Sequence, residues 1–201
     1  MIPTFPKIQV NKDIYLREIS EKDAARYYKY ITHEKVKQFV PINCLPNNEA
    51  KALSDLLFLI NLYKLRRGIY WAIATKNDDQ LIGTCGYETW HKNHARLELV
   101  YDLDPNFWGK NIMHLALEQI INFAFSNMPI NRIEAVTTPD NDKSKKVLQK
   151  LNFTEEGILR QYRYYKYNFT DVCIFSILRE EHKLGTDILT NKDVVKYLHG
   201  N

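Results

Sequence analysis

The sequence predicts an α+β protein in which a mixed, mostly antiparallel central sheet is flanked by helices. Two stretches carry this prediction. Between residues 97 and 103 the side chains alternate with the period of two that is typical of a strand with two different faces. After Gly109, apolar residues recur at helical spacing and form one continuous stripe: Met113, Ala116, Leu117, Ile120, Ile121 and Ala124.

The remaining elements follow from local signals. Ser20 lies three residues ahead of Asp23, a pairing typical of a helix start, and Asn77 to Asp79 has the composition of a hairpin turn. We expect strands at 14–18, 69–75, 80–90, 94–103 and 131–137, near 153–160, and at 171–178. We expect helices at 20–32, 46–66, 109–127, 141–151 and 190–198. The resulting order is β-α-α-β-β-β-α-β-α-β-β, followed by a C-terminal helix.

Composition sets bounds on the organisation of the chain. Its 201 residues, 45% of them hydrophobic, suffice for one well-buried core and are few for two, so we expect a single domain. A net charge of +4 permits an anionic ligand but is not the strong basic excess of a nucleic-acid-binding protein. Because the first residues lack the features of a signal peptide and no apolar run reaches a membrane-spanning length, we expect a cytoplasmic protein without a membrane partner.

Cysteine and histidine spacing indicates a reducing compartment and no metal site. Cys44, Cys85 and Cys173 are odd in number and form no C-x-x-C pair. His91 and His94 have no companion cysteines or carboxylates. Cys85 lies within a predicted strand without an evident histidine partner, so we interpret it as a core residue and not as a nucleophile.

The segment from Glu98 to Met113 predicts an anion-binding site. It reads as a strand, a proline at position 105, a polar turn around Gly109 and the start of a helix. Such a turn presents free backbone N–H groups and the positive end of a helix dipole to a ligand such as a pyrophosphate. Neither a P-loop nor a G-x-G-x-x-G motif occurs in the chain, which disfavours the two common nucleotide-binding folds.

This segment resembles the acetyl-CoA-binding motif of the GNAT superfamily of N-acetyltransferases. The resemblance is strongest to the branch that acetylates protein N-termini, including those of ribosomal proteins. Residues matching the first motif are Glu98, Tyr101, Leu103, Pro105 and Gly109. Residues matching the second are Asn141, Ser144, Leu148, Lys150, Phe153, Glu156 and Gly157, and Asp171 matches the start of the last strand. The resemblance covers residues 12–182 and leaves 183–201 as an extension that we expect to be helical.

The resemblance implies a direct transfer of an acetyl group from acetyl-CoA to a primary amine in a ternary complex. Glu98 is then the candidate base and Ser144 the candidate proton donor to the departing thiolate. The residues expected to hold the cofactor are Phe107, Trp108, Gly109, Lys110, Asn111, Ile112 and Asn141. Lys143, Lys145 and Lys146 would add diffuse positive charge.

Alternative interpretations remain open for these residues. Glu98 is equally a strand carboxylate that faces solvent or pairs with Arg96 or Arg132. Asn141 can simply cap its helix, and Ser144 is equally an ordinary residue of the first helical turn. Val100, Asn111 and Asn152 stand where the family has glycines. Asparagine tolerates left-handed backbone better than other non-glycine residues, so we expect the turn at Asn111 to persist.

The acceptor is the least determined part of the function. A protein or peptide N-terminus fits the branch, and a polyamine or an antibiotic amine is the second choice. The glycine replacements keep open a non-catalytic module that binds CoA or associates with RNA. The tyrosine-rich run 160–167 is interpreted first as a structural strand, then as a wall of the acceptor site, and last as a nucleic-acid surface. We expect a monomer or a homodimer.

Overall fold

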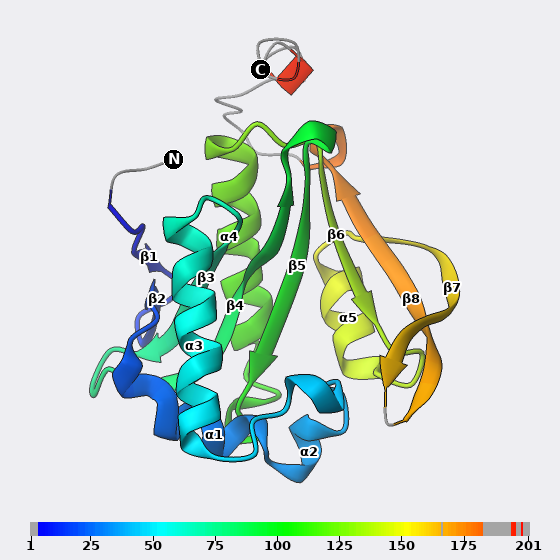
Figure 1. The fold of residues 1–201 in the computed structure, drawn as a ribbon. Coiled ribbons are helices and arrows are strands. Elements are labelled where there is room, and N and C mark those ends of the chain that lie inside the picture. The colour runs from blue at the N-terminus through cyan, green and yellow to red at the C-terminus, as the bar shows by residue number, and fades with distance from the viewer. Residues whose placement is uncertain (1–3, 166, 183–193, 196–197, 199–201) are drawn as a thin grey trace.

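An eight-stranded sheet forms the centre of the protein, with the strand order β1-β2-β3-β4-β5-β6-β8-β7. The structure is a computed structural model and describes residues 4–165, 167–182, 194, 195 and 198 (Figure 1). The strands are β1 (Ile8–Gln9), β2 (Ile14–Glu18), β3 (Ile69–Thr75), β4 (Leu81–His91), β5 (Arg96–Leu103), β6 (Arg132–Thr137), β7 (Thr154–Tyr165) and β8 (Asn168–Leu178). All neighbouring strands are antiparallel except β5 and β6, which are parallel. The α+β prediction is confirmed.

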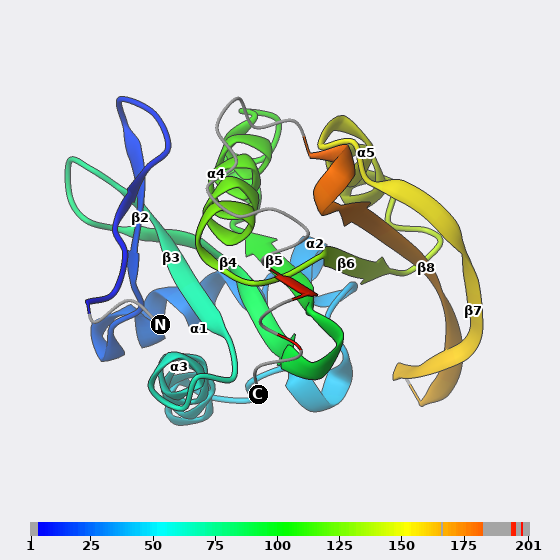
Figure 2. The same cartoon turned by 90° about the horizontal axis from the view of Figure 1, so that it is seen from above.

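Helices cover both faces of this sheet. Within the described residues they are α1 (Ala24–Ile31), α2 (Glu34–Lys37), α3 (Glu49–Lys64), α4 (Ile112–Asn127) and α5 (Asp142–Lys150). Figure 2 shows α4 and α5 on one face and α1 and α3 on the other. None of the helices in this part of the chain combines the length and the apolar character that a membrane crossing requires.

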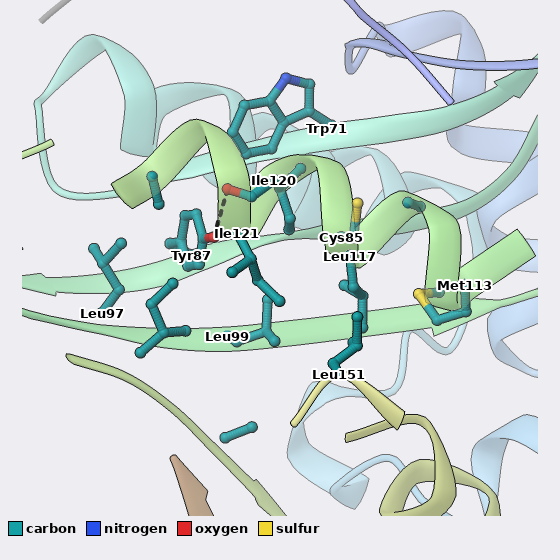
Figure 3. Packing of buried hydrophobic residues seen from close by; sticks show 14 of the residues in the cluster. Trp71, Cys85, Tyr87, Leu97, Leu99, Met113, Leu117, Ile120, Ile121 and Leu151 are labelled. Atoms are coloured by element: carbon teal, nitrogen blue, oxygen red, sulfur yellow. Dashed lines mark hydrogen bonds between the residues drawn. The ribbon is translucent and has the colours of Figure 1, made fainter. Parts of the chain in front are cut away.

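The core lies between α4 and the middle strands. Every residue of the apolar stripe predicted on this helix is buried. Tyr87 on β4 passes under α4 and donates a hydrogen bond of 2.8 Å from its hydroxyl to the carbonyl oxygen of Ile120 (Figure 3). Full burial of each large apolar side chain contributes roughly 1.5–3 kcal/mol. The packing therefore holds the N-terminus of α4 at a fixed place above β5.

Strands β5 and β6 pair only where they begin. Their register joins Arg96 to Arg132, Leu97 to Ile133 and Glu98 to Glu134, and no pairing follows. Figure 1 shows the two strands side by side at one end and separated at the other. The central sheet is consequently open between β5 and β6 beyond Glu98.

Several element boundaries differ from the sequence prediction. Helix α4 begins at Ile112 and not at 109, because the preceding turn takes a left-handed conformation at Asn111. Helix α3 begins at Glu49 and not at 46, because the side chain of Asn48 caps it by accepting from the N–H of Lys51 at 2.8 Å. The Ser20–Asp23 capping box is present, but it begins a 3-10 turn that leads into α1.

Other differences concern whole elements. The last two strands are longer than predicted, and the short β1 and α2 were not predicted. Two strand residues and one helical turn are too short for periodicity to reveal. The predicted helix at 190–198 falls largely outside the described residues.

Candidate active site

The separation of β5 and β6 opens a cleft of about 1400 Å³. Its walls include β5 from Glu98 to Leu103, the residues 135–138 at the end of β6, and the first turns of α4 and α5. The other end is lined by α1, the loop after α2, α3 and the β7–β8 hairpin. Pockets for drug-sized ligands measure roughly 300–1,000 Å³. The cleft therefore has room for a long ligand and a second molecule beside it.

The turn before α4 leaves a row of backbone donors free at one end of this cleft. Gly109 and Asn111 both have positive φ, +75° and +59°, which only glycine and a few polar residues adopt readily. Within the described chain, the backbone N–H groups from Gly109 to His114 have no protein acceptor, and the helical ladder begins with Leu115 donating to Asn111. Free N–H groups at the positive end of a helix dipole suit the oxygens of a pyrophosphate. The expectation that the turn persists at Asn111 is confirmed.

Aromatic and basic side chains surround this turn. Trp108 donates from Nε1 to the carbonyl oxygen of Leu103 at 2.8 Å, and the Nζ of Lys143 lies 3.8 Å from the centre of a Trp108 ring. Both Lys143 and Lys146 line the cleft. Lys110 is not among the lining residues, and its Nζ lies over the ring of Phe107 at 5.0 Å.

The remaining predicted cofactor residues lie together along the same wall. They are Phe107, Trp108, Gly109, Asn111, Ile112 and Asn141, and all of them line the cleft. Lys145 is held by an ion pair with Asp142 at 2.9 Å. The lysines of α5 that line the cleft are thus Lys143, Lys146 and Lys150.

Ser144 and Tyr101 form a hydroxyl pair in the middle of the cleft. Asn141 caps α5 by accepting from the backbone N–H of Ser144 at 3.2 Å, so the capping interpretation of Asn141 holds. The Oγ of Ser144 lies 2.7 Å from the hydroxyl oxygen of Tyr101 on β5. Burial raises the pKa of the Tyr101 hydroxyl, and the hydrogen bond with Ser144 opposes this rise. Both hydroxyls therefore keep their protons at neutral pH and are available as donors.

Glu98 lies at the point where the cleft begins and faces it. Its Oε1 accepts from the Nη2 of Arg163 on β7 at 3.1 Å. The two partners that the sequence suggested, Arg96 and Arg132, both pair with Glu134 instead. The carboxylate thus joins β5 to the hairpin across the cleft.

Several site residues were missed by the sequence analysis. Arg163, Glu88, His114 and Thr138 all line the cleft. His114 and Thr138 each have a buried polar side-chain atom without a partner in the described residues. Tyr101 was part of the matched motif, but nothing in the sequence linked it to Ser144. Residues 160–165 of the tyrosine-rich run lie in β7, and Tyr162 and Tyr164 line the cleft.

The described cysteines are all unpaired. Cys85 is fully buried, and burial raises the pKa of its thiol well above the usual value. A protonated thiol without access to solvent is a poor nucleophile. The interpretation of Cys85 as a core residue is confirmed.

Comparison with known proteins identifies the class to which this fold and cleft belong. Residues 13–154 match the family model of the acetyltransferase (GNAT) domain. An uncharacterized N-acetyltransferase of Bacillus licheniformis, p20, is 33% identical over 168 residues, which cover 83% of this chain and 93% of the relative. The chain therefore belongs to the GNAT acetyltransferase family and is an acyltransferase that uses acetyl-CoA.

Solved structures show the same fold. The ribosomal-protein-S5-alanine acetyltransferase of Vibrio fischeri is 26% identical with a TM-score of 0.75, covering 89% of this chain and 100% of that one. RimL, a ribosomal L7/L12 α-N-protein acetyltransferase solved with coenzyme A, is 19% identical with a TM-score of 0.80, covering 88% and 100%. At that identity RimL supports the fold alone.

The residues at the cleft fit acetyl-CoA. The free N–H groups from Gly109 to His114 match the acceptor oxygens of a pyrophosphate. The unpartnered Nδ1 of His114 and Oγ1 of Thr138 are polar atoms that a ligand in the cleft would satisfy. A bound ligand thus completes hydrogen bonds that the protein alone leaves unmade.

Proposed function

We propose that the protein acetylates the N-terminal α-amine of a peptide or protein. The observation that carries this proposal is the continuity of the cleft, which joins the phosphate-binding turn to a wall formed by the β7–β8 hairpin. Tyr162 and Tyr164 on that wall are 59% and 51% exposed and offer broad faces to an extended chain. The resemblance to an acetyltransferase that acts on a ribosomal protein supports the same acceptor class.

Glu98 is the proposed base. Acetyl-CoA, when bound, supplies an acetyl group activated as a thioester. The Glu98 carboxylate, directly or through a water molecule, accepts the proton that the amine loses as its nitrogen forms a bond with the acetyl carbon. Beyond Glu98 the edge of β5 has no strand neighbour on the β6 side, so its N–H groups are suited to polarise the acetyl oxygen.

Ser144 is the proposed proton donor to the sulfur that leaves when the C–S bond breaks. Its hydroxyl lies at the start of α5, and the hydroxyl of Tyr101 lies 2.7 Å from it and can replace the proton. Asn141 fixes the position of Ser144 by capping the helix, and we propose that it also contacts the cofactor. Phe107, Trp108, Gly109, Lys110, Asn111 and Ile112 are proposed to hold the phosphate end.

A small amine is the second candidate acceptor, and one observation favours it. The acceptor end of the cleft contains the carboxylates Asp55, Glu88 and Glu98, which attract cations. A non-catalytic role is disfavoured, because Asn111 and Asn152 both adopt the positive φ of the glycines that they replace, +59° and +62°.

The test is calorimetric titration with acetyl-CoA, followed by an acetylation assay. We expect binding in the micromolar range, and acetylation of peptides that begin with alanine or serine in preference to spermidine or aminoglycosides. Mass spectrometry of the products locates the acetyl group. Faster acetylation of the small amines would replace the proposed acceptor, and no binding at millimolar acetyl-CoA would contradict the proposed activity itself.

A further inference from the structure

Glu88 occupies a bulge in β4 directly beside Glu98. The register of β4 and β5 pairs Tyr87 with Leu99 and Thr89 with Glu98, which leaves Glu88 as an extra residue without a partner on β5. Such bulges redirect a side chain and are frequent next to active sites. Both Glu88 and Glu98 face the cleft. Two carboxylates from adjacent strands therefore meet at its acceptor end.

Glu88 differs from the other carboxylates of the cleft in having no partner. Asp55 pairs with Lys51, and Glu98 pairs with Arg163. Asp102 accepts hydrogen bonds from Tyr30 at 2.6 Å and from the hydroxyl of Thr84 at 2.7 Å. Among the described residues, the Glu88 carboxylate makes neither a hydrogen bond nor an ion pair, although it is exposed to the cleft.

The surroundings of Glu88 favour the binding of a cation next to its carboxylate. Burial and the negative charge of Glu98 raise the pKa of the Glu88 carboxyl above its usual value, while Arg163 lowers it. The neighbouring wall is largely apolar and includes Tyr27, Ile31, Phe39, Val40, Phe58 and Tyr70. A cation placed in the cleft beside Glu88 would offset this repulsion between the two carboxylates.

We propose that Glu88 is the residue that binds the ammonium group of the acceptor and selects charged primary amines over neutral groups of the same shape. This inference rests on the proposed function, because it assigns the acceptor end of the same cleft. The ammonium becomes the partner that Glu88 lacks within the protein. Glu98, on the neighbouring strand, is then placed to receive the proton once the amine is bound.

A binding experiment tests this assignment without any need for turnover. The CoA-saturated protein is titrated with n-butylammonium chloride and with n-butanol, and backbone amide NMR shifts of β4 and β5 report binding. We expect the wild type to prefer the ammonium by about tenfold, the usual strength of a hydrogen bond to a charged group. Glu88→Gln should abolish this preference, whereas Glu118→Gln, which changes an exposed glutamate on α4, should retain it.

Kinetics supply an independent readout once an acceptor is identified. Glu88→Gln should raise the KM for the acceptor by about tenfold and leave the Kd for acetyl-CoA unchanged. Thermal melting checks that the variant is folded. If Glu88→Gln keeps the ammonium preference, or if the wild type shows none, the assignment of Glu88 is wrong even when acetyl-CoA binds. If acetyl-CoA fails to bind, the proposed function fails separately.

Discussion

The hydroxyl groups of Tyr101 and Ser144 come from residues 43 positions apart and lie 2.7 Å from each other. Each belongs to one of the two family motifs, so the fold brings the motifs together at this contact. Ser144 and Tyr101 are both half-buried, and both line the cleft. We propose that Ser144 is the group that touches the sulfur and that Tyr101, hydrogen-bonded to it, positions its proton.

Replacement of Ser144 tests this role. Ser144→Ala should lower kcat by about 100-fold, the lower range of general acid catalysis, and leave the Kd for acetyl-CoA unchanged. Tyr101→Phe should lower kcat less, because Ser144 keeps its own hydroxyl. An assay of the CoA thiol that is released measures kcat, and calorimetry measures the Kd for acetyl-CoA. A loss of acetyl-CoA binding in Ser144→Ala would instead make Ser144 a cofactor-binding residue.

Residue roles were predictable where a backbone requirement limits the choice of side chain. Asn111 and Asn152 replace glycines at left-handed positions, and asparagine is the residue type that tolerates them. Glu88 was not predictable because a β-bulge sets its direction, and Arg163 was not because it follows a shift in the register of β7 and β8. Arg163 pairs with Glu98, which is 65 positions away in the chain, so no local pattern reveals the contact.

A network of ion pairs ties β5, β6, β7 and β8 together where the cleft begins. Arg132 on β6 contacts Glu156 through two parallel hydrogen bonds of 2.7 and 2.6 Å. Glu156 lies in a bulge of β7 and also accepts from Ser176 on β8 at 2.7 Å. On the other side, Glu134 accepts from both Arg96 and Arg132. The network fixes the strands at the end where β5 and β6 still pair.

This network predicts a specific loss of stability in acid. The hydrogen bonds with Arg132 lower the pKa of Glu156 from 4.5 to about 2. The folded state therefore binds this proton less readily than the unfolded state, so the contribution of Glu156 is complete above pH 4.5 and is lost as the pH falls toward 2. Urea unfolding between pH 6 and pH 3 should show a weaker pH dependence in Glu156→Gln than in the wild type.

Exposure to solvent limits how much Glu156 contributes to the free energy of unfolding. The Glu156 side chain is 38% exposed, so Glu156→Gln should cost at most about 1 kcal/mol at neutral pH. Glu118→Gln is the matched control, because Glu118 is an exposed helix residue outside the network. Equal pH dependence in Glu156→Gln and the wild type would contradict the role of the pair.

Helix α4 shows why an element is easier to predict than its boundary. Its buried stripe was evident from spacing, because tertiary packing and local pattern agree there. The start was placed three residues early, since a turn that leaves its N–H groups free for a ligand lacks the capping side chain that marks most helix starts. The local signal therefore fails at the turn that we propose binds the cofactor.

The sheet consists of two parts that share only three residue pairs between β5 and β6. One part contains β1 to β5 and the other contains β6, β8 and β7. The cleft residues that would hold acetyl-CoA come from both parts, since the turn at Gly109 follows β5 while Asn141 and Ser144 follow β6. A ligand in the cleft therefore connects the two parts.

Ligand binding should consequently stabilise the whole protein. At an acetyl-CoA concentration 100 times its Kd, the free energy of unfolding should rise by about 2.7 kcal/mol if only the folded state binds. Chemical denaturation with and without the ligand measures this difference. Hydrogen exchange should slow in β6 and β8 as well as in β5. Protection confined to β5 and α4 would contradict a ligand that connects both parts.

The open edge of β5 has a consequence for aggregation. Beyond Glu98 its backbone groups face no strand on the β6 side, and such an edge is a template for pairing with any extended chain. Proteins usually shield an edge with charged residues, prolines or a covering helix, whereas this edge lines the cleft that we propose holds the cofactor. A cofactor in the cleft would then act as a removable cover, and preparations depleted of it should be the ones that self-associate.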